Sequence, residues 1–207
     1  EPMPTLYQDI QATYPKLDVN IFDNLDEAQI QGIEVAGLVP VVSGLSIYGN
    51  GMFTRGKVLL INGKEPAPAK PWEKNLRREP PLNGIVGIRW ERPSDRFWGE
   101  FFVRGTAKQD RLNRDDIRDP RIPGKTRDIK DPTKPDSKGV EFDEDGRAID
   151  AGSPGWVTLN IRGGVRLTEY NRLNAAIENI LDKRYREHGS GVDAPGLNLI
   201  VSLDNRF

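Results

Sequence analysis

The chain ends on GLNLIVSLDNRF, residues 196–207, and this stretch alternates between apolar and polar residues. The apolar set is Leu197, Leu199, Val201, Leu203 and Phe207, and the polar set is Asn198, Ser202, Asp204 and Arg206. An alternation of period two predicts a β-strand with one apolar and one polar face. In a soluble protein the apolar face points to a core, whereas in a membrane barrel it points to lipid. The choice between these arrangements depends on the rest of the chain.

The composition excludes several classes of function. The 207 residues include 30 basic and 31 acidic residues, a formal net charge of -1, so we expect no nucleic-acid partner. The absence of cysteine excludes disulfides, thiolate metal sites and a cysteine nucleophile. No stretch approaches about 18 consecutive apolar residues, which a membrane-spanning helix needs. The 21 glycines and 16 prolines favour an all-β protein that is rich in turns.

Strand-like segments recur along the whole chain. Seven are predicted, at residues 28–38, 44–56, 83–92, 97–107, 155–166, 172–181 and 196–207, and LYQDIQA at residues 6–12 is a candidate eighth. Each of the seven has about ten residues or more, whereas a strand of a soluble domain typically has about 5–6. A tilted strand that crosses a bilayer needs about 9–11 residues.

The segment 155–166 carries charge in the middle of a strand. Val157 and Ile161 fall on one face, and Asn160 and Arg162 fall on the other. A charged side chain is costly against a packed apolar core but suits a water-filled lumen. This segment therefore favours the barrel.

The links between the strands alternate between short and long. In an antiparallel meander all short links then lie at one end of the sheet and all long links at the other, as in outer-membrane barrels. The long links cover about 57–82, 108–154 and 182–195, and we expect them to be extracellular loops. The link 108–154 is highly charged and rich in proline, so burying it would be costly, and a structureless loop of this length argues for a functional one. A soluble β-sandwich that binds a ligand or a carbohydrate stays the alternative.

Three stretches resemble one known family. LNAAIENILDKRYREHGSGVDAPGLNLIVSLDNRF, residues 173–207, resembles the closing segment of TonB-dependent outer-membrane receptors, in which an EN-L-DK-Y strand end precedes a final strand ending in Phe. AQIQGIEVAG at 28–37 and PPLNGIVGIRW at 80–90 are similar to earlier strands of these receptors. The match covers most of residues 20–207, with the strands in the family's order.

The resemblance implies an all-β, antiparallel up-and-down meander: residues 1–207 are the last seven or eight strands of a barrel of about 22 strands in the cell outer membrane. Such receptors import a scarce ligand, such as an iron-siderophore, haem or cobalamin, with energy from TonB acting on an N-terminal part that this chain lacks. The expected partners are outer-membrane lipid and the barrel-assembly machinery, which reads the C-terminal strand with Phe207 as its signal. We expect no cofactor and no catalysis.

The alternation also predicts which side chains face lipid and which face the lumen. The lipid-facing strip is Val157, Leu159, Ile161, Leu197, Leu199, Val201, Leu203 and Phe207, and the lumen strip is Asn160, Arg162, Glu178, Asn198, Ser202 and Asp204. Trp90, Trp98 and Trp156 lie near strand ends, where barrels place aromatic girdles at the membrane interfaces.

Four residues of the long links are candidates for ligand binding. Arg118 and Arg121 belong to a mixed-charge run that could hold an anion such as a ferric siderophore, and Trp72 could stack on a ligand. His188 is the only histidine, so it is either a single metal or haem ligand or simply solvated, and no metal cluster is predicted.

Two further patterns resemble functional sites, a hydrolase triad and a calcium loop, but have simpler structural interpretations. Ser190 and Asp193 lie close to His188, as in a hydrolase triad, but no G-x-S-x-G pattern surrounds the serine, so a barrel enzyme is the weaker rival. FDEDGRAID at 142–150 lacks the spacing of a calcium loop and favours a hairpin that turns at Asp145-Gly146.

Overall fold

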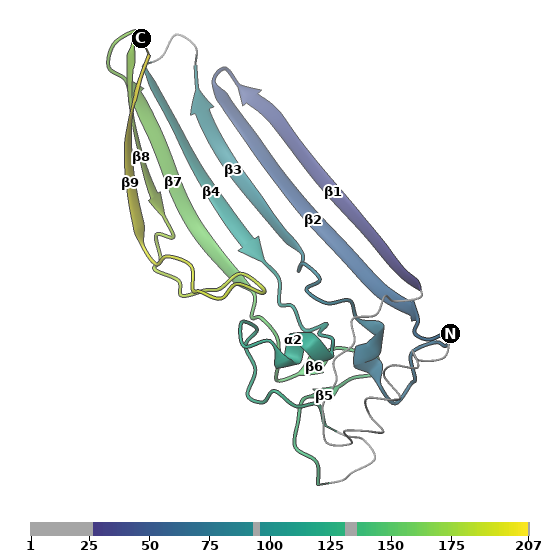
Figure 1. Cartoon of the computed structure of the whole chain (residues 1–207). Helices are drawn as coiled ribbons and strands as arrows, with labels where there is room; N and C mark the ends of the chain where they lie inside the picture. The colour runs from purple at the N-terminus through teal and green to yellow at the C-terminus, as the bar shows by residue number, and fades with distance from the viewer. Residues whose placement is uncertain (1–26, 93–95, 131–135, 207) are drawn as a thin grey trace.

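The computed structural model describes residues 27–92, 96–130 and 136–206. Its main element is a seven-stranded sheet in the order β1-β2-β3-β4-β7-β8-β9. The strands are β1 (Glu27–Val42), β2 (Leu45–Leu60), β3 (Asn83–Glu91), β4 (Phe97–Thr106), β7 (Trp156–Arg166), β8 (Asn171–Glu178) and β9 (Asn198–Asn205). Every neighbouring pair is antiparallel, which confirms the meander. Figure 1 shows the seven strands side by side.

The strand bounds differ from the expected ones at several ends. β1 continues through Pro40, which an edge strand tolerates, and the chain then turns at Ser43 and Gly44, whose φ is +84°. β2 continues to Leu60, so the first long link begins at residue 61 rather than 57. The last long link spans residues 179–197. The candidate strand at residues 6–12 and Phe207 lie outside the described residues.

One face of the sheet, which we call the apolar face, carries one large apolar side chain from every strand in register. These residues are Val39, Ile47, Ile88, Phe101, Ile161, Ile177 and Leu199. Their exposed fractions run from 39% for Phe101 and Ile177 to 70% for Leu199. The next row of cross-strand partners points to the opposite, polar face and holds Arg89, Glu100 and Arg162. In the sheet of a soluble protein the apolar face is buried against a core and the charged face is exposed to water.

The main buried core lies in the longest link. Leu112, Ile117, Ile122, Val140, Ala148 and Ala151 form one cluster. Helix α2 (Arg114–Arg118) and a hairpin of β5 (Glu141–Phe142) and β6 (Ala148–Ile149) fold around it. The expectation of a structureless loop was therefore wrong, because the apolar residues of this core are scattered singly among charged ones and show no period. The hairpin turns from Asp143 to Gly146, whose φ is +75°, which confirms the predicted turn.

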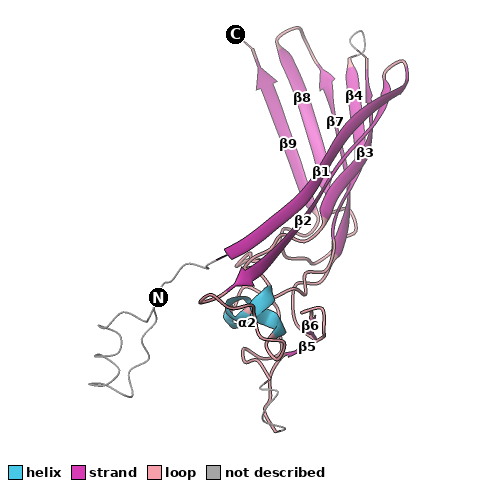
Figure 2. Cartoon of the chain, turned by 90° about the vertical axis from the view of Figure 1, so that its right-hand side faces the viewer, coloured by secondary structure: helices cyan, strands magenta, loops and turns pink. Residues whose placement is uncertain are grey.

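The first two long links form one folded unit. The first contains a short 3-10 helix, η1 (Pro71–Lys74), followed by the buried Asn75. Asn75 Nδ2 donates to the carbonyl oxygens of Leu112 at 3.0 Å and Gly146 at 2.7 Å. We call residues 61–82, 107–130 and 136–155 the loop unit; it gathers at one end of the sheet (Figure 2). None of the helices in the described part of the chain is long and apolar enough to span a membrane.

Candidate functional site

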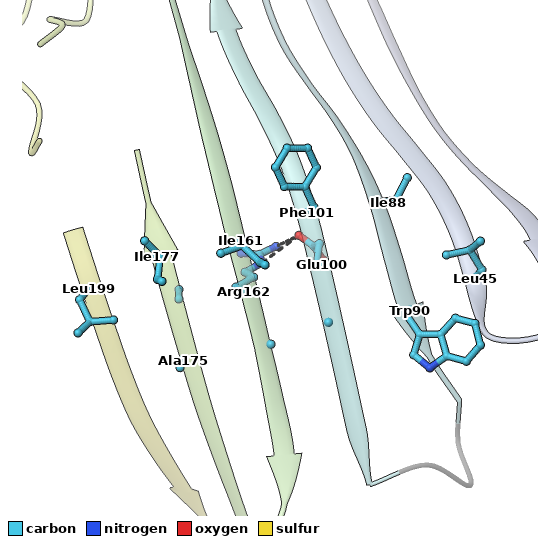
Figure 3. Close-up of a pocket in the computed structure, with 13 residues that line it drawn as sticks. Leu45, Ile88, Trp90, Glu100, Phe101, Ile161, Arg162, Ala175, Ile177 and Leu199 are labelled. Carbon is cyan, nitrogen blue, oxygen red and sulfur yellow. Dashed lines mark hydrogen bonds and ion pairs between the residues drawn. The ribbon is translucent and has the colours of Figure 1, made fainter. Parts of the chain in front are cut away.

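A buried carboxylate organises the polar face. Glu100 on β4 accepts hydrogen bonds from Tyr48 Oη at 2.6 Å, Arg89 Nη1 at 3.0 Å and Arg162 Nε at 2.9 Å. Figure 3 shows Arg162 reaching Glu100, and it also draws the apolar side chains of the opposite face, such as Ile88, Phe101 and Ile161. Because a buried charge is costly unless it is paired, these donors stabilise Glu100 and join four neighbouring strands.

Two tryptophans lie on the polar face, so the expectation of a girdle position for Trp98 and Trp156 was wrong. Trp98 Nε1 donates to Asn174 Oδ1 at 3.3 Å, and Trp156 is buried with its ring centroid 4.1 Å from that of Tyr185. Nearness to a strand end does not decide the face; the position in the alternation does. Trp90 does lie on the apolar face, paired with Gly99.

The last long link folds back over the polar face. The Asn179 backbone N–H donates to Asn160 Oδ1 at 2.9 Å, and Arg104 Nη2 donates to Glu187 Oε1 at 2.7 Å. A cavity of about 380 Å³ lies between this link, the loop unit and strands β2 to β4. We call it the polar-face pocket; its polar lining includes Asn50, Arg78, Asn83, Arg104, Thr106, Glu187 and His188.

His188 has one nitrogen in use and one without a partner. Nδ1 lies 2.9 Å from Ser153 Oγ, and the buried Nε2 has no hydrogen-bond partner within the described residues. Burial lowers the pKa of His188, so the imidazole is neutral at pH 7. A neutral imidazole with a vacant nitrogen can donate to or accept from a ligand in the polar-face pocket.

The structure does not bring the proposed triad together. Ser190 Oγ donates to the carbonyl oxygen of Val192 at 2.9 Å, and His188 contacts Ser153 instead. Asp193 pairs with Arg184 and Arg186, which lower the pKa of its carboxyl group. Among the described residues, no group of three or more His, Cys, Asp or Glu is placed to hold a metal ion.

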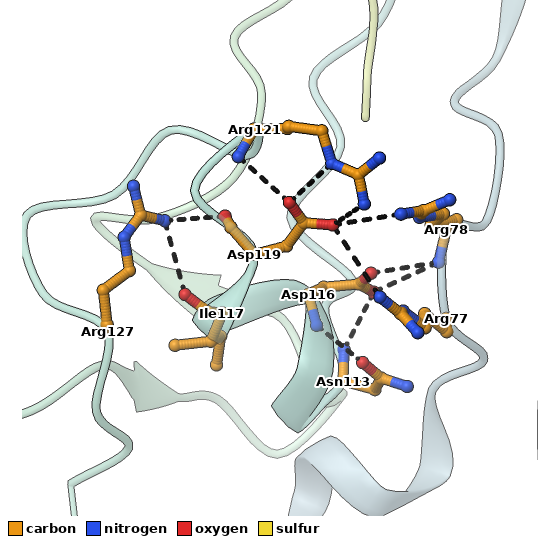
Figure 4. Close-up of polar contacts among 8 residues, drawn as sticks. All are labelled: Arg77, Arg78, Asn113, Asp116, Ile117, Asp119, Arg121 and Arg127. Atoms are coloured by element: carbon orange, nitrogen blue, oxygen red, sulfur yellow. Dashed lines mark hydrogen bonds and ion pairs between the residues drawn. The ribbon is translucent and has the colours of Figure 1, made fainter. Parts of the chain in front are cut away.

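Asp119 and Asp116 hold the loop unit together (Figure 4). The buried Asp119 carboxylate accepts from Arg121 Nε at 2.8 Å and Nη2 at 2.6 Å, and from Arg78 Nη2 at 3.2 Å. Asp116, whose pKa is raised by burial, accepts the backbone N–H groups of Arg78 and Asn113 and completes a capping box with Asn113. The guanidinium of Arg121 is therefore engaged inside the fold.

A second cavity, of about 490 Å³, lies between η1 and α2 in the loop unit. We call it the basic cavity; its charged and aromatic lining is Lys70, Trp72, Glu73, Arg114, Arg118, Asp128, Lys130 and Lys138. The four residues predicted to bind a ligand therefore lie at three different places in the structure. Trp72 and Arg118 share the basic cavity, His188 lines the polar-face pocket, and Arg121 belongs to the Asp119 cluster. Sequence reasoning counted Arg114 in the mixed-charge run without singling it out, and it missed Lys138, which nothing in the sequence marks as a site residue.

Comparison with known proteins places this fold in a class. No protein-family model and no curated protein matches the sequence. Solved structures match in fold. The copper transporter OprC matches with a TM-score of 0.58 and 21% identity, over 87% of this chain and 23% of that one. The FrpB iron transporter of Neisseria meningitidis matches with a TM-score of 0.55 and 12% identity, over 87% of this chain and 23% of that one. The ferric enterobactin receptor PfeA of Pseudomonas aeruginosa also matches, with a TM-score of 0.52 and 16% identity, over 89% of this chain and 23% of that one.

These matches define the fold as an antiparallel up-and-down meander of β-strands. More particularly, the seven-stranded meander has the fold of a C-terminal barrel segment of TonB-dependent receptors. The chain spans about 23% of the length of each of these structures. At identities of 12% to 21%, the likeness is one of fold.

Proposed function

We propose that this chain forms part of the wall of a TonB-dependent receptor that imports a scarce ligand, such as an iron-siderophore, haem or cobalamin, across the cell outer membrane. The observation that carries the proposal is the row of seven exposed apolar side chains on one face, opposite the buried Glu100 network on the other. Lipid covers such an apolar face, and a water-filled lumen suits the polar one.

The same register supports the proposed strips of side chains. Leu159 and Ile161 pair with Val103 and Phe101, so they share the apolar face. Leu199, Val201 and Leu203 of β9 continue this face, with Leu199 paired with Ile177, and Leu197 directly precedes the strand. Asn160 and Arg162 lie on the polar face, which lines the lumen in this proposal. Outer-membrane lipid is therefore one partner, and the barrel-assembly machinery is another, through the C-terminal strand and Phe207.

A soluble β-sandwich fits the structure less well. A sandwich needs a second sheet packed over the apolar face. In the described part of the chain the other sheet is β5-β6, with two residues in each strand, and it belongs to the loop unit. A barrel hydrolase lacks support because His188 and Ser190 have other partners, so we expect no catalytic role.

The polar-face pocket is the proposed ligand contact on the import route. In this proposal it lies on the lumen side, and His188 and Arg104 are among the residues that line it. The link 179–197, which forms one wall, is in this proposal an extracellular loop, and so is the loop unit. TonB supplies the energy by acting on a part of the receptor outside this chain.

Uptake by cells tests the proposal. Deletion of the parent gene is expected to abolish accumulation of one labelled ligand among ferric siderophores, haem and cobalamin, and the intact gene is expected to restore it only when TonB is present. Arg104→Ala should reduce uptake, whereas Arg172→Ala, at the exposed opposite end of the sheet, should leave it unchanged. Uptake that is equal with and without TonB contradicts the proposal.

A further inference from the structure

Most arginines of the loop unit are engaged in holding its fold. Arg121 and Arg78 pair with Asp119, and Arg147 pairs with Asp110 at 3.6 Å. Arg127 Nη1 donates to three carbonyl oxygens, those of Ile117, Asp119 and Ile122. These arginines therefore stabilise the fold of the loop unit.

Three exposed cations of the loop unit gather around one cavity. Arg114, Arg118 and Lys138 are exposed and make no ion pair and no side-chain hydrogen bond within the described residues. All three line the basic cavity. Arg114 and Arg118 come from α2, one turn apart, and Lys138 comes from the segment that leads to β5.

The basic cavity has a positive charge that its own carboxylates do not balance. Lys70 and Lys130 add two cations to its lining, and the anions are Glu73 and Asp128. Glu73 pairs with Lys70 at 3.1 Å, and Lys130 pairs with Glu141 at 2.6 Å. Like charges that face one concavity repel each other, and an anion bound among them removes that repulsion.

The uncharged part of the wall is Trp72 together with Ala69 and Ile129. The Trp72 ring centroid lies 5.5 Å from that of Phe142, so the indole is fixed by packing against the hairpin. The volume of about 490 Å³ falls within the range of about 300–1,000 Å³ typical of small-molecule sites. Guanidinium groups bind phosphate and carboxylate through two parallel hydrogen bonds.

We infer that the basic cavity binds a ligand that carries two or more phosphate or carboxylate groups, held by Arg114, Arg118 and Lys138 against Trp72. Recognition is of the oxygen atoms of the anion itself, because the lining offers only two carboxylates and one of them is paired with a lysine. The inference rests on the proposed function only in placing the loop unit at the cell surface. The ligand's source is either a soluble polyanion or the phosphorylated headgroup of a surface lipid.

Binding to the full-length protein in detergent micelles tests the inference, with inorganic pyrophosphate as the probe and calorimetry as the readout. We expect wild-type protein to bind pyrophosphate with an affinity that falls as NaCl is added. Arg114→Ala and Arg118→Ala should each weaken binding by about tenfold, the effect of one lost charge-assisted hydrogen bond. Lys125→Ala is the matched control, because Lys125 is an exposed cation of the loop unit outside the cavity, and it should bind as wild type does.

A second arm separates the two sources. Phosphatidylcholine vesicles with and without lipid A are mixed with the protein, and co-flotation is measured. Lipid A-dependent binding that pyrophosphate displaces assigns the site to a lipid headgroup; pyrophosphate binding without co-flotation assigns it to a soluble polyanion. Either result supports the inference.

Two outcomes overturn the inference: wild-type protein that binds neither probe, or arginine variants that bind pyrophosphate as tightly as wild type. Both arginines are exposed, so the variants are expected to fold, and circular dichroism checks this. Binding and uptake are separate measurements. Loss of binding with TonB-dependent uptake intact removes only this inference, and binding without any uptake removes only the proposed function.

Discussion

The carboxylate of Glu100 is expected to stabilise the seven-stranded sheet more than any exposed ion pair of that sheet does. The perturbation is Glu100→Gln, which keeps the shape of the side chain and removes its charge. Glu100 is buried and accepts from Tyr48, Arg89 and Arg162 at 2.6 to 3.0 Å. Breaking a buried ion pair costs about 3–5 kcal/mol. The side chains of Arg89 and Arg162 are 33% and 46% exposed, so water screens part of their attraction to Glu100. We therefore expect Glu100→Gln to lower the free energy of unfolding by about 2–3 kcal/mol.

The assay is urea unfolding of the full-length protein in detergent micelles, with the free energy of unfolding extrapolated to water. Glu91→Gln is the matched control, because Glu91 pairs with the same Arg89 at 2.6 Å but is 42% exposed. An exposed pair contributes about 0–1 kcal/mol. If Glu100→Gln loses no more stability than Glu91→Gln, the reasoning about the buried network is refuted.

Three more predictions test the loop unit, the last link and the apolar face. Asp116→Ala removes the acceptor of the partly buried N–H groups of Arg78 and Asn113, at up to about 1–3 kcal/mol each, so hydrogen exchange should quicken in residues 107–130 and not in β4. Unchanged exchange in residues 107–130 contradicts this prediction. Burial lowers the pKa of His188 in the folded state below its ordinary value, so the unfolded state binds more protons at a pH between the two pKa values. The link 179–197 should therefore become less protected from hydrogen exchange as the pH falls from 7 to 5. His188→Gln should abolish that dependence on pH, and a wild-type link equally protected at both pH values argues against it. In the proposed barrel, Leu199→Arg would place a charge in lipid and should cost about 2–4 kcal/mol near the bilayer centre, seen as a lower folded fraction in vesicles. A folded fraction equal to that of wild type counts against a lipid contact at Leu199.

The strands and their faces could be predicted because both depend on local alternation. Val157 and Ile161 alternate with Asn160 and Arg162, and a period of two fixes the face as soon as the segment is a strand. The order of short and long links then led to the meander. The bounds were less certain, as at Pro40, where the sequence indicates an end and an edge strand continues.

The loop unit could not be predicted because its core depends on contacts between distant residues. Leu112, Ile122 and Val140 are single apolar residues in charged surroundings, and only the folded chain brings them together. The same limit applies to the candidate site. Arg118 and Arg121 look alike in the sequence, yet Arg121 is bound to Asp119 while Arg118 lines the basic cavity. The partner of a charged side chain is a property of the fold.

The direction of the two faces is the central claim, and single spin labels at neighbouring positions of β7 measure it most directly. This chain has no cysteine, so Ile161→Cys and Arg162→Cys each introduce one label site into it. In the full-length protein in lipid vesicles, we predict that the label at 161 collides with oxygen dissolved in the bilayer and that the label at 162 collides with a water-soluble nickel complex. A label at 162 that lies in lipid, or labels at both positions that lie in water, would contradict the account.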